Sequence, residues 1–318
     1  MGYKLAGCEV LGCVEIDPRM NECYVANHHP KYNYLMDIRK FNEMPNEELP
    51  EELFNLDILD GSPPCTTFSM AGDREDSWGK KKKFREGQAE QTLDDLSFVF
   101  IDTVAKLRPK VMIMENVEGL IKGEAWSYVQ RIYKQLNDIG YQVKHWLLKG
   151  ENMGIPQARH RVFFIASRND IEYNLDNIDM AFNYEPIRYR AIKAGKLKPI
   201  GKDTAFYKVA QQAAPQDKSI ADTRIRLGQK GSAFQTYYIR DEDVMPTQRA
   251  KPDLIDLEHI AYVSADTIRN AQTFPQDYKF MPDTYSNVGY ICGMSVPPVM
   301  IKRIVTRLLE TNIFCKEN

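Results

Sequence analysis

The chain has 318 residues, of which 43% are hydrophobic and 27% charged, and its formal net charge is −2. These values are typical of a globular protein with one or two domains, and they exclude a chain that is basic throughout. No apolar run approaches the roughly 20 residues that span a membrane, and the N-terminus lacks the zones of a signal peptide. We therefore expect a cytoplasmic protein without a membrane partner.

The six cysteines form no Cys-x-x-Cys pair and no cysteine–histidine cluster with zinc spacing, which predicts a reducing compartment and no metal. Two local basic stretches occur, at residues 80–85 and 188–202. A charge run is usually only a solvated face, but either stretch could contact nucleic acid.

Two short apolar pieces with acids at their ends come first in the chain. Residues 11–14 predict a strand that leads into Glu15, and a helix is expected from Pro18 to about His28. Residues 35–38 contain Asp37. An acid after a strand can bind the hydroxyl groups of a ribose or accept a hydrogen bond from adenine. Taken alone, either acid is more often a helix cap or a turn residue.

An acidic surface helix is expected over residues 44–53, followed by a buried strand at 56–59. That strand ends in Gly61-Ser62-Pro63-Pro64-Cys65, in which the prolines stiffen the backbone and hold the thiol in place. A positioned cysteine is a strong nucleophile, although a free cysteine after a turn explains this stretch equally well. Residues 66–91 are polar and glycine-rich, typical of an active-site lid or of an insertion.

Helices and strands alternate over the next part of the chain. A helix is expected at 93–107, a buried strand at 110–117, a helix at 125–139 closed by Gly140, and a strand at 141–148. Glu115 stands at the carboxyl end of its strand, so it should share one rim with Cys65. Arg159 and Arg161 alternate ahead of a strand at 162–166 and can face the same side. After about residue 172 the apolar pattern fades until residue 293.

Five motifs in this order resemble those of the DNA cytosine-5 methyltransferases, and the resemblance covers almost the whole chain. They are Gly61-Ser62-Pro63-Pro64-Cys65, Glu115-Asn116-Val117, Gln157-Ala158-Arg159-His160-Arg161, Gln272-Thr273-Phe274-Pro275-Gln276-Asp277-Tyr278 and Ser295-Val296-Pro297-Pro298. The resemblance implies an α/β fold, with a Rossmann-like methyltransferase domain at 1–185 plus 290–318 and a mostly parallel sheet. Residues 186–289 would form a smaller, irregular target-recognition domain.

The resemblance also implies the chemistry. Cys65 would add to carbon 6 of a cytosine flipped out of double-stranded DNA. Glu115 would hold or donate the proton at the ring nitrogen, Arg161 would bind the base carbonyl, and Arg159 would help fix the pocket or Glu115. The cofactor would be S-adenosyl-L-methionine, and its contacts would be Glu15, Ile16, Asp37, Pro64, Leu93 and Val296. We expect a monomer, and the resemblance leaves open a companion restriction endonuclease.

Two features depart from the family pattern. The family begins with an apolar strand and a glycine loop at the cofactor, whereas this sequence begins at Met1-Gly2-Tyr3, which resembles the helix that follows. Met294 stands where the family usually has asparagine, so a hydrogen-bond donor is lost. An internal start and a truncated copy both explain the first departure. The alternatives to the DNA enzyme are therefore a cofactor-deficient DNA-binding homologue and a tRNA cytosine-5 methyltransferase.

Overall fold

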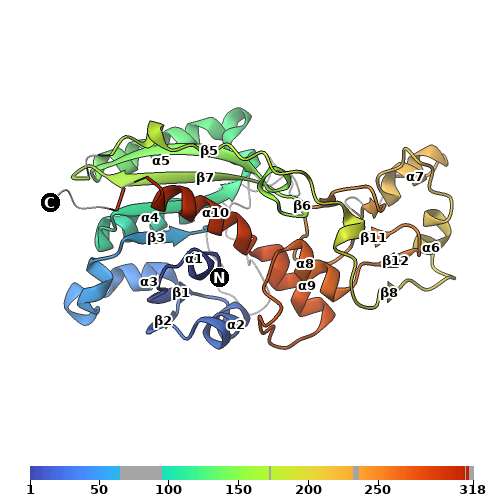
Figure 1. Ribbon diagram of the computed structural model, residues 1–318, viewed down its shortest axis with the longest axis horizontal. Helices are drawn as coiled ribbons and strands as arrows, with labels where there is room; N and C mark the ends of the chain where they lie inside the picture. Colours follow the sequence, from blue (N-terminus) through green and yellow to red (C-terminus); the bar gives the residue numbers. More distant parts are fainter. Residues whose placement is uncertain (65–94, 172, 232–235, 312, 315–318) are drawn as a thin grey trace.

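The structure is a computed structural model that describes residues 1–64, 95–171, 173–231, 236–311, 313 and 314. Cys65, Leu93 and the predicted lid at 66–91 lie outside the described residues. Figure 1 shows an elongated molecule, in which a large α/β lobe on the left is joined to a smaller lobe on the right.

The large lobe contains most of the regular structure. Its strands are β1 (Gly12–Glu15), β2 (Tyr32–Leu35), β3 (Ile58–Gly61), β4 (Val111–Val117), β5 (Tyr141–Lys149), β6 (Gln157–Ala158) and β7 (His160–Arg168). Its helices are α1 (Gly2–Leu5), α2 (Pro18–His28), α3 (Ile38–Glu43), α4 (Leu96–Leu107), α5 (Trp126–Asp138), α9 (Tyr285–Met294) and α10 (Pro298–Leu309), with 3-10 turns η1 (Asn46–Glu48), η2 (Glu51–Phe54), η4 (Glu118–Ile121), η5 (Gly123–Ala125), η6 (Gly150–Met153) and η7 (Leu175–Asn177).

The strands of the large lobe fall into two separate main sheets. One has the order β3-β4-β7-β5, in which β3 and β4 are parallel and β7 runs antiparallel to both its neighbours. The other contains only the parallel pair β1-β2. Within the described residues, no strand pairing joins β1 to β3, so backbone hydrogen bonds do not connect the two sheets. In Figure 1, α1 lies between the two parts.

Apolar cores cover both faces of the four-stranded sheet. Because side chains alternate along a strand, Met112 and Met114 of β4 face α4 and α5, while Val111 and Ile113 face α10. All four methionine, valine and isoleucine side chains are essentially inaccessible to solvent. The sheet is therefore a rigid support for the residues at its strand ends.

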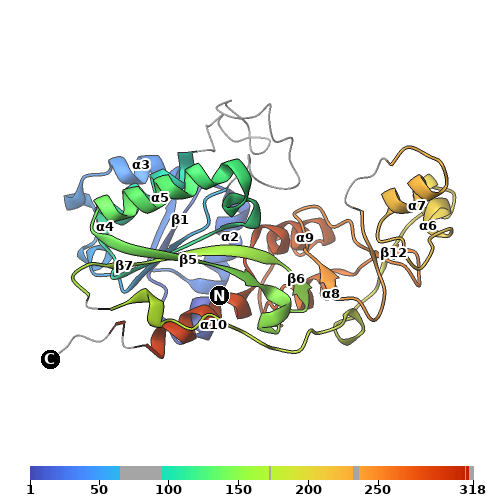
Figure 2. The same ribbon diagram turned by 90° about the horizontal axis from the view of Figure 1, so that it is seen from above.

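The small lobe has its own sheet and core. Its strands are β8 (Lys198–Pro199), β9 (Tyr238–Ile239), β11 (Ile255–Asp256) and β12 (Ala261–Tyr262), in the order β8-β12-β11-β9, and β10 (Met245–Pro246) pairs with β6 of the large lobe. Its helices are α6 (Ala205–Ala210), α7 (Ile220–Arg226) and α8 (Ala265–Ala271), with the 3-10 turn η8 (Tyr189–Ala191). Figure 2 shows β6, α8 and α9 between the two lobes.

Most of the predicted helices and strands agree with the structure, and two segments differ. Residues 44–53 do not form a helix but the two 3-10 turns η1 and η2, because Pro45 and Pro50 each interrupt the backbone hydrogen bonding. Leu49 and Leu53 from this segment are buried rather than on the surface. The second apolar piece also starts earlier than its pattern indicated, since β2 spans Tyr32–Leu35 and ends two residues before Asp37.

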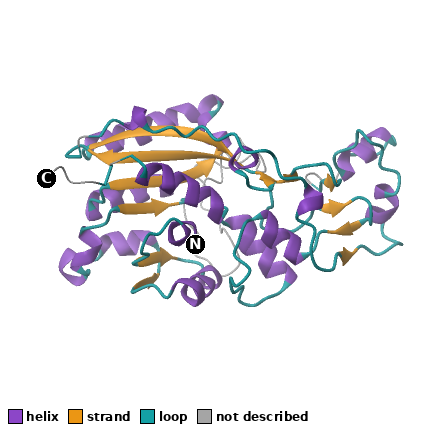
Figure 3. Cartoon of the chain, viewed as in Figure 1, coloured by secondary structure: helices purple, strands orange, loops and turns teal. Residues whose placement is uncertain are grey.

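One stretch, Tyr285–Leu309, is apolar and long enough to be considered as a membrane span. It consists of α9 and α10, which are separated at Ser295 and Pro297, and most of it is buried inside the protein. Figure 3 shows both helices packed within the fold. Core packing accounts for the apolar character of this stretch.

Candidate active site

Glu115 and Arg161 meet at the carboxyl end of β4. The Arg161 Nε lies 2.8 Å from Glu115 Oε1, and the two side chains are 16% and 14% exposed. In the antiparallel pairing of β4 with β7, Glu115 lies opposite Phe163 and Val117 lies opposite Arg161. Glu115 and Arg161 are therefore diagonal neighbours on one face of the sheet, which brings their side chains together. Arg161 also donates to the carbonyl oxygen of His160, at 2.7 Å. A guanidinium has five N–H donors, so Arg161 retains donors for a ligand.

Asn116 connects this pair to the turn that precedes Cys65. Its side chain is buried, and its Nδ2 donates to the carbonyl oxygen of Pro63 over 3.3 Å. Its Oδ1 accepts the N–H of Val117 at 2.9 Å. The sequence predicts no separate role for Asn116, although its place beside Glu115 at the strand end is a signal for one. Asn116 thus fixes the Pro63-Pro64 turn relative to Glu115.

The turn also depends on a close approach of two elements. A Cβ on Gly61, the last residue of β3, would lie 2.5 Å from the ring of Phe100 in α4. Real Cβ atoms do not come so near, so only glycine allows β3 to end against α4 here. Pro64 follows three residues later at an intermediate burial. The placement of Cys65 beside Glu115 remains a prediction.

Arg159 lies deeper than Arg161 and binds backbone rather than a carboxylate. Its guanidinium is buried, with Nη1 donating to the carbonyl oxygen of Gln248 and Nη2 to that of Gly293, both at 3.2 Å. Burial is the first cause that lowers the pKa of Arg159, to about 9, and the positive charge of Arg161 acts in the same direction. Its Nε has no hydrogen-bond partner among the described residues.

The predicted cofactor acids come together at the ends of β1 and β2. Glu15 ends β1 opposite Leu35, and Asp37 follows β2 by two residues. Both carboxylates accept backbone N–H groups of the next turn: Glu15 from Asp17 at 2.8 Å, and Asp37 from Arg39 at 2.9 Å. Asp37 is also the N-cap of α3. Burial raises the pKa of Glu15, although the hydrogen bond from Asp17 opposes the shift.

Arg39 is a further residue of this region, and no sequence pattern marks it. Its Nη2 lies 2.7 Å from Asp95, the residue before α4, while its backbone binds Asp37. It therefore links the first turns of α3 and α4.

The remaining predicted cofactor residues are more scattered. Ile16 follows Glu15 in the bend after β1, and Val296 packs against the core beneath α10. Met294, where the family pattern has asparagine, is 36% exposed. The neighbouring Ser295 is held instead, because its carbonyl oxygen accepts from Gln272 at 2.6 Å.

The basic stretch at 188–202 is only partly available to a ligand. Arg190 pairs with Glu242, and Lys193 is surrounded by Asp241, Asp256 and Glu258. Lys196 and Lys202 are exposed and have no acidic partner among the residues that the structure describes.

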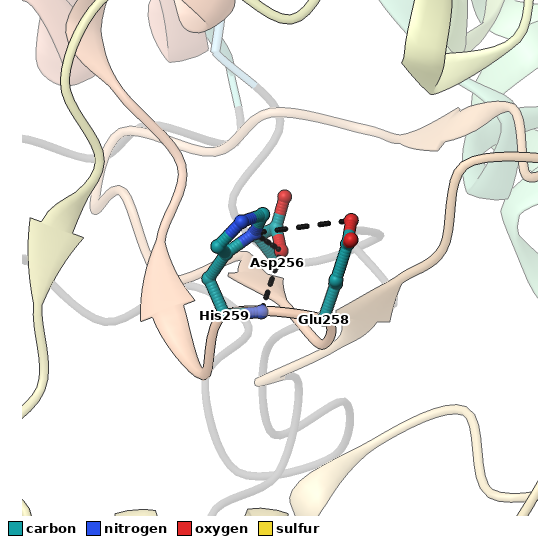
Figure 4. Close-up of side chains that lie close together, drawn as sticks. All are labelled: Asp256, Glu258 and His259. Atoms are coloured by element: carbon teal, nitrogen blue, oxygen red, sulfur yellow. Dashed lines mark hydrogen bonds and ion pairs between the residues drawn. The ribbon is translucent and has the colours of Figure 1, made fainter.

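A cluster of Asp256, Glu258 and His259 has the donor types of a metal site. In Figure 4 the ring and the backbone N–H of His259 both point to Asp256, with Nδ1 at 2.9 Å and N at 3.0 Å from Oδ1. The hydroxyl of Tyr189 binds the other carboxylate oxygen at 2.8 Å. Lys193 Nζ lies 3.1 Å from Glu258 and 3.5 Å from Asp256. The lysine ammonium therefore already provides the positive charge that a metal ion would bring to these carboxylates.

Comparisons with known proteins bear on the family and the fold of the chain. A family model described as C-5 cytosine-specific DNA methylase matches residues 1–310. The type II methyltransferase M.Bsp6I of Bacillus sp. (strain RFL6) is 30% identical over 326 residues, which cover 98% of this chain and 95% of that protein. The orphan methyltransferase M.Rho11sI of Bacillus phage rho11s is 25% identical over 287 residues, which cover 88% of this chain.

The chain spans about half the length of several curated relatives, 51% in the case of the phage protein. A solved structure of a prophage-encoded E. coli protein, described as a DNA modification methyltransferase, superposes with a TM-score of 0.67 at 18% identity and covers 98% of this chain and 94% of its own. That likeness confirms the predicted α/β methyltransferase fold. The match over residues 1–310 establishes that the chain belongs to the C-5 cytosine-specific DNA methylase family.

Proposed function

We propose that the protein transfers a methyl group from S-adenosyl-L-methionine to carbon 5 of a cytosine flipped out of double-stranded DNA. The observation that carries the proposal is the Glu115–Arg161 pair, tied through Asn116 to the turn before Cys65. A carboxyl group, a guanidinium and a thiol are the three groups needed to hold cytosine by its edge and attack its ring.

Each residue has a separate task in this proposal. The Cys65 thiolate adds to carbon 6, which makes carbon 5 nucleophilic, and Glu115 supplies a proton to the ring nitrogen as negative charge develops. Arg161 donates to the carbonyl oxygen of the base. After methyl transfer, loss of the carbon-5 proton restores the double bond and expels Cys65 as thiolate. Arg159 holds the backbone around the pocket.

The cofactor residues fit S-adenosyl-L-methionine at its adenosine end. Glu15 is an acceptor for ribose hydroxyls and Asp37 for the adenine amine, and Ile16 offers an apolar wall. Pro64 and Leu93 would border the adenine, and Val296 the methionine part. When bound, S-adenosyl-L-methionine supplies an electrophilic methyl group; the chain orients it and excludes water.

We assign DNA recognition to residues 186–289. Between residues 201 and 231 this region has six basic and three acidic residues, and one of the acids, Asp217, is already paired with Arg226. Arg224 and the 64%-exposed Ile225 lie on α7 at the far end of the small lobe. A cationic surface with an exposed apolar side chain suits contact with phosphates and base edges.

A second candidate is a DNA-binding homologue that does not bind the cofactor. It is favoured by the division between the β1-β2 pair and the β3-β4-β7-β5 sheet, since the cofactor acids lie on the smaller part. The two candidates differ in one measurable property, which is the affinity of the chain for S-adenosyl-L-methionine.

The decisive experiment combines binding with transfer. The purified chain is titrated with S-adenosyl-L-methionine by calorimetry and then incubated with methyl-labelled cofactor and either duplex DNA or tRNA. We expect micromolar cofactor binding and label in duplex DNA, with bisulfite sequencing giving the site. DNA binding without cofactor binding would select the second candidate, and label in tRNA alone would show a tRNA methyltransferase.

A further inference from the structure

Three glutamines are fully buried where the two lobes meet. Gln157 belongs to β6, Gln248 follows β10, and Gln272 follows α8, and each has no solvent-accessible surface. Burying an amide costs free energy unless its hydrogen bonds are made. Two of the three, Gln157 and Gln272, bond to each other, which indicates a specific link rather than filler of a core.

The amides of Gln157 and Gln272 are bonded to each other and to backbone, whereas the Gln248 amide donates only to the carbonyl oxygen of Arg249 and its Oε1 has no partner among the described residues. Gln157 Nε2 donates to Gln272 Oε1 at 2.9 Å, and Gln157 Oε1 accepts the backbone N–H of Gln248 at 3.0 Å. Gln272 Nε2 donates to the carbonyl oxygen of Ser295 at 2.6 Å. One chain of hydrogen bonds thus joins the large-lobe strand β6, the small-lobe segment after β10 and the turn before Val296.

The same segments hold the buried arginine of the site. Arg159 donates to the carbonyl oxygens of Gln248 and Gly293, one on each side of the network. Thr247 adds a bond from its hydroxyl to the carbonyl oxygen of Ala158, at 2.7 Å, and β6 pairs in parallel with β10. Moving the segment after β10 would therefore move Arg159 and the turn at Ser295 together.

We propose that Gln157 and Gln272 are positioning residues that lock the small lobe to the catalytic centre, so that DNA held by one is aligned with the base pocket and methyl donor of the other. The inference rests on the proposed function. If Gln157 and Gln272 position the lobes, replacing them should lower the rate of methyl transfer. If they only fill the core, replacing them should lower stability without a separate effect on that rate. Among the described residues, the hydrogen bonds of these two side chains go to Ala271, Gln248, Ser295 and each other, so they act through Arg159 and Ser295.

The test uses Gln157→Met and Gln272→Met in the full chain, because methionine has nearly the length of glutamine but cannot make these bonds. The matched control is Thr103→Val, which removes a buried hydroxyl that bonds to Asn42 Oδ1 at 2.8 Å, away from the lobe junction. Three properties are measured: kcat for methyl transfer, Kd for a duplex oligonucleotide and the midpoint of thermal unfolding.

We expect each glutamine variant to lower kcat about 10-fold or more, since misplacement of reacting groups by about 1 Å costs up to 100-fold. The Kd for DNA should change by less than about 3-fold, because the phosphate contacts are retained. The double variant should be little worse than either single variant, as one shared link is lost. A kcat like that of Thr103→Val at equal loss of thermal stability would overturn the proposal.

Hydrogen exchange separates this proposal from the proposed function and serves if a variant is inactive. In Gln157→Met, backbone N–H groups at 247–249 and 293–296 should exchange faster than in the unmodified chain, while those of β4 and β7 keep their protection. Unchanged exchange in both segments would refute the lock, whatever the activity. Faster exchange in Gln157→Met, combined with an unmodified chain that methylates neither DNA nor RNA, would support the lock and reject the methyltransferase proposal.

Discussion

The two ends of the candidate site are built differently. At the base end, Glu115, Arg161 and Asn116 contact one another or the preceding turn, and they stand on a sheet with apolar cores on both faces. At the cofactor end, Glu15 and Asp37 are bonded mainly by the turns that follow them, on a two-stranded sheet. Contacts between side chains of different strands fix those side chains relative to one another before a ligand binds. A hydrogen bond within one turn fixes only the side chain that makes it.

This difference predicts where substitutions act. Changes at the base end should lower kcat, because the groups there touch the reacting ring. Changes at the cofactor end should appear in the affinity for S-adenosyl-L-methionine.

The largest effect among residues of the described site is expected at Glu115. Glu115→Gln keeps the size of the side chain but removes the acid, and general acid catalysis contributes about 100- to 10,000-fold. We expect kcat to fall at least 100-fold while the Kd for duplex DNA stays within about 3-fold. Glu52→Gln is the matched control, since Glu52 pairs with Lys31 and not with Arg161. Near-normal turnover by Glu115→Gln would mean that another group protonates the ring.

An intermediate effect is expected at Asn116. Asn116→Ala releases the Pro63 carbonyl oxygen and so loosens the turn that leads to Cys65, and we expect kcat to fall roughly 10-fold. Asn42→Ala loses a similar amide-to-carbonyl bond, from Nδ2 to Val99 at 3.0 Å, without touching the site. Equal kinetics in the two variants would remove the positioning role of Asn116.

A smaller, pH-dependent effect is expected at Glu15. Because burial raises its pKa, Glu15 protonates at a higher pH than a free glutamate, so cofactor affinity should fall as the pH is lowered from 7.5 towards 5.5. Glu15→Gln should weaken the affinity several-fold at pH 7.5 and remove this pH dependence. Calorimetric titration at both pH values measures it, with Glu22→Gln on α2 as the control.

The raised pKa of Glu15 affects stability in the opposite direction from cofactor affinity: raising the pH favours cofactor binding but lowers the stability of the fold. A raised pKa in the folded state means that the protonated form stabilises the fold, and this contribution is lost as the pH rises through the folded-state pKa. At pH 7.5, Glu15→Gln should therefore raise the midpoint of thermal unfolding. A lower midpoint would contradict the assigned cause of the shift.

The smallest effect is expected in the basic stretch of the small lobe. Lys196→Ala combined with Lys202→Ala should weaken DNA binding a few-fold and reduce the salt dependence by about one phosphate contact per residue. Lys193→Ala should instead lower stability, with little change in the slope of DNA affinity against salt concentration. The reason is that Lys193 is already paired with Asp241, Asp256 and Glu258. Equal slopes for both variants would place the phosphate contacts elsewhere.

The motifs and their strand ends could be predicted from the sequence because each depends on local pattern. Apolar runs and turn residues are enough to predict three of the elements. These are the strand before Pro63-Pro64, the strand that carries Glu115 and the helix closed by Gly140. Pro45 and Pro50, which divide residues 44–53 into two 3-10 turns, are also local features, so these turns were predictable from the sequence.

What could not be predicted depends on contacts distant in the sequence. Gln157 and Gln272 are 115 residues apart and meet only because α8 packs at the lobe junction. Lys193 is neutralised by Asp241, which lies in a turn some 50 residues after it, and by Asp256 of β11. These acids are distant in the sequence, so the sequence alone does not show that the basic stretch is partly neutralised. The bond between Asn116 and Pro63 depends on the register of β3 against β4, which no local pattern fixes.

The central claim is that Cys65 forms a covalent bond to cytosine, and one measurement tests it directly. Duplex DNA carrying 5-fluorocytosine at the methylated site is incubated with the protein and S-adenosyl-L-methionine, followed by denaturing electrophoresis and mass spectrometry. Fluorine at carbon 5 cannot leave as a proton, so the adduct should persist, map to the peptide containing Cys65 and be absent in Cys65→Ala. Methyl transfer to ordinary cytosine without any such adduct, or transfer by Cys65→Ala, would contradict the account.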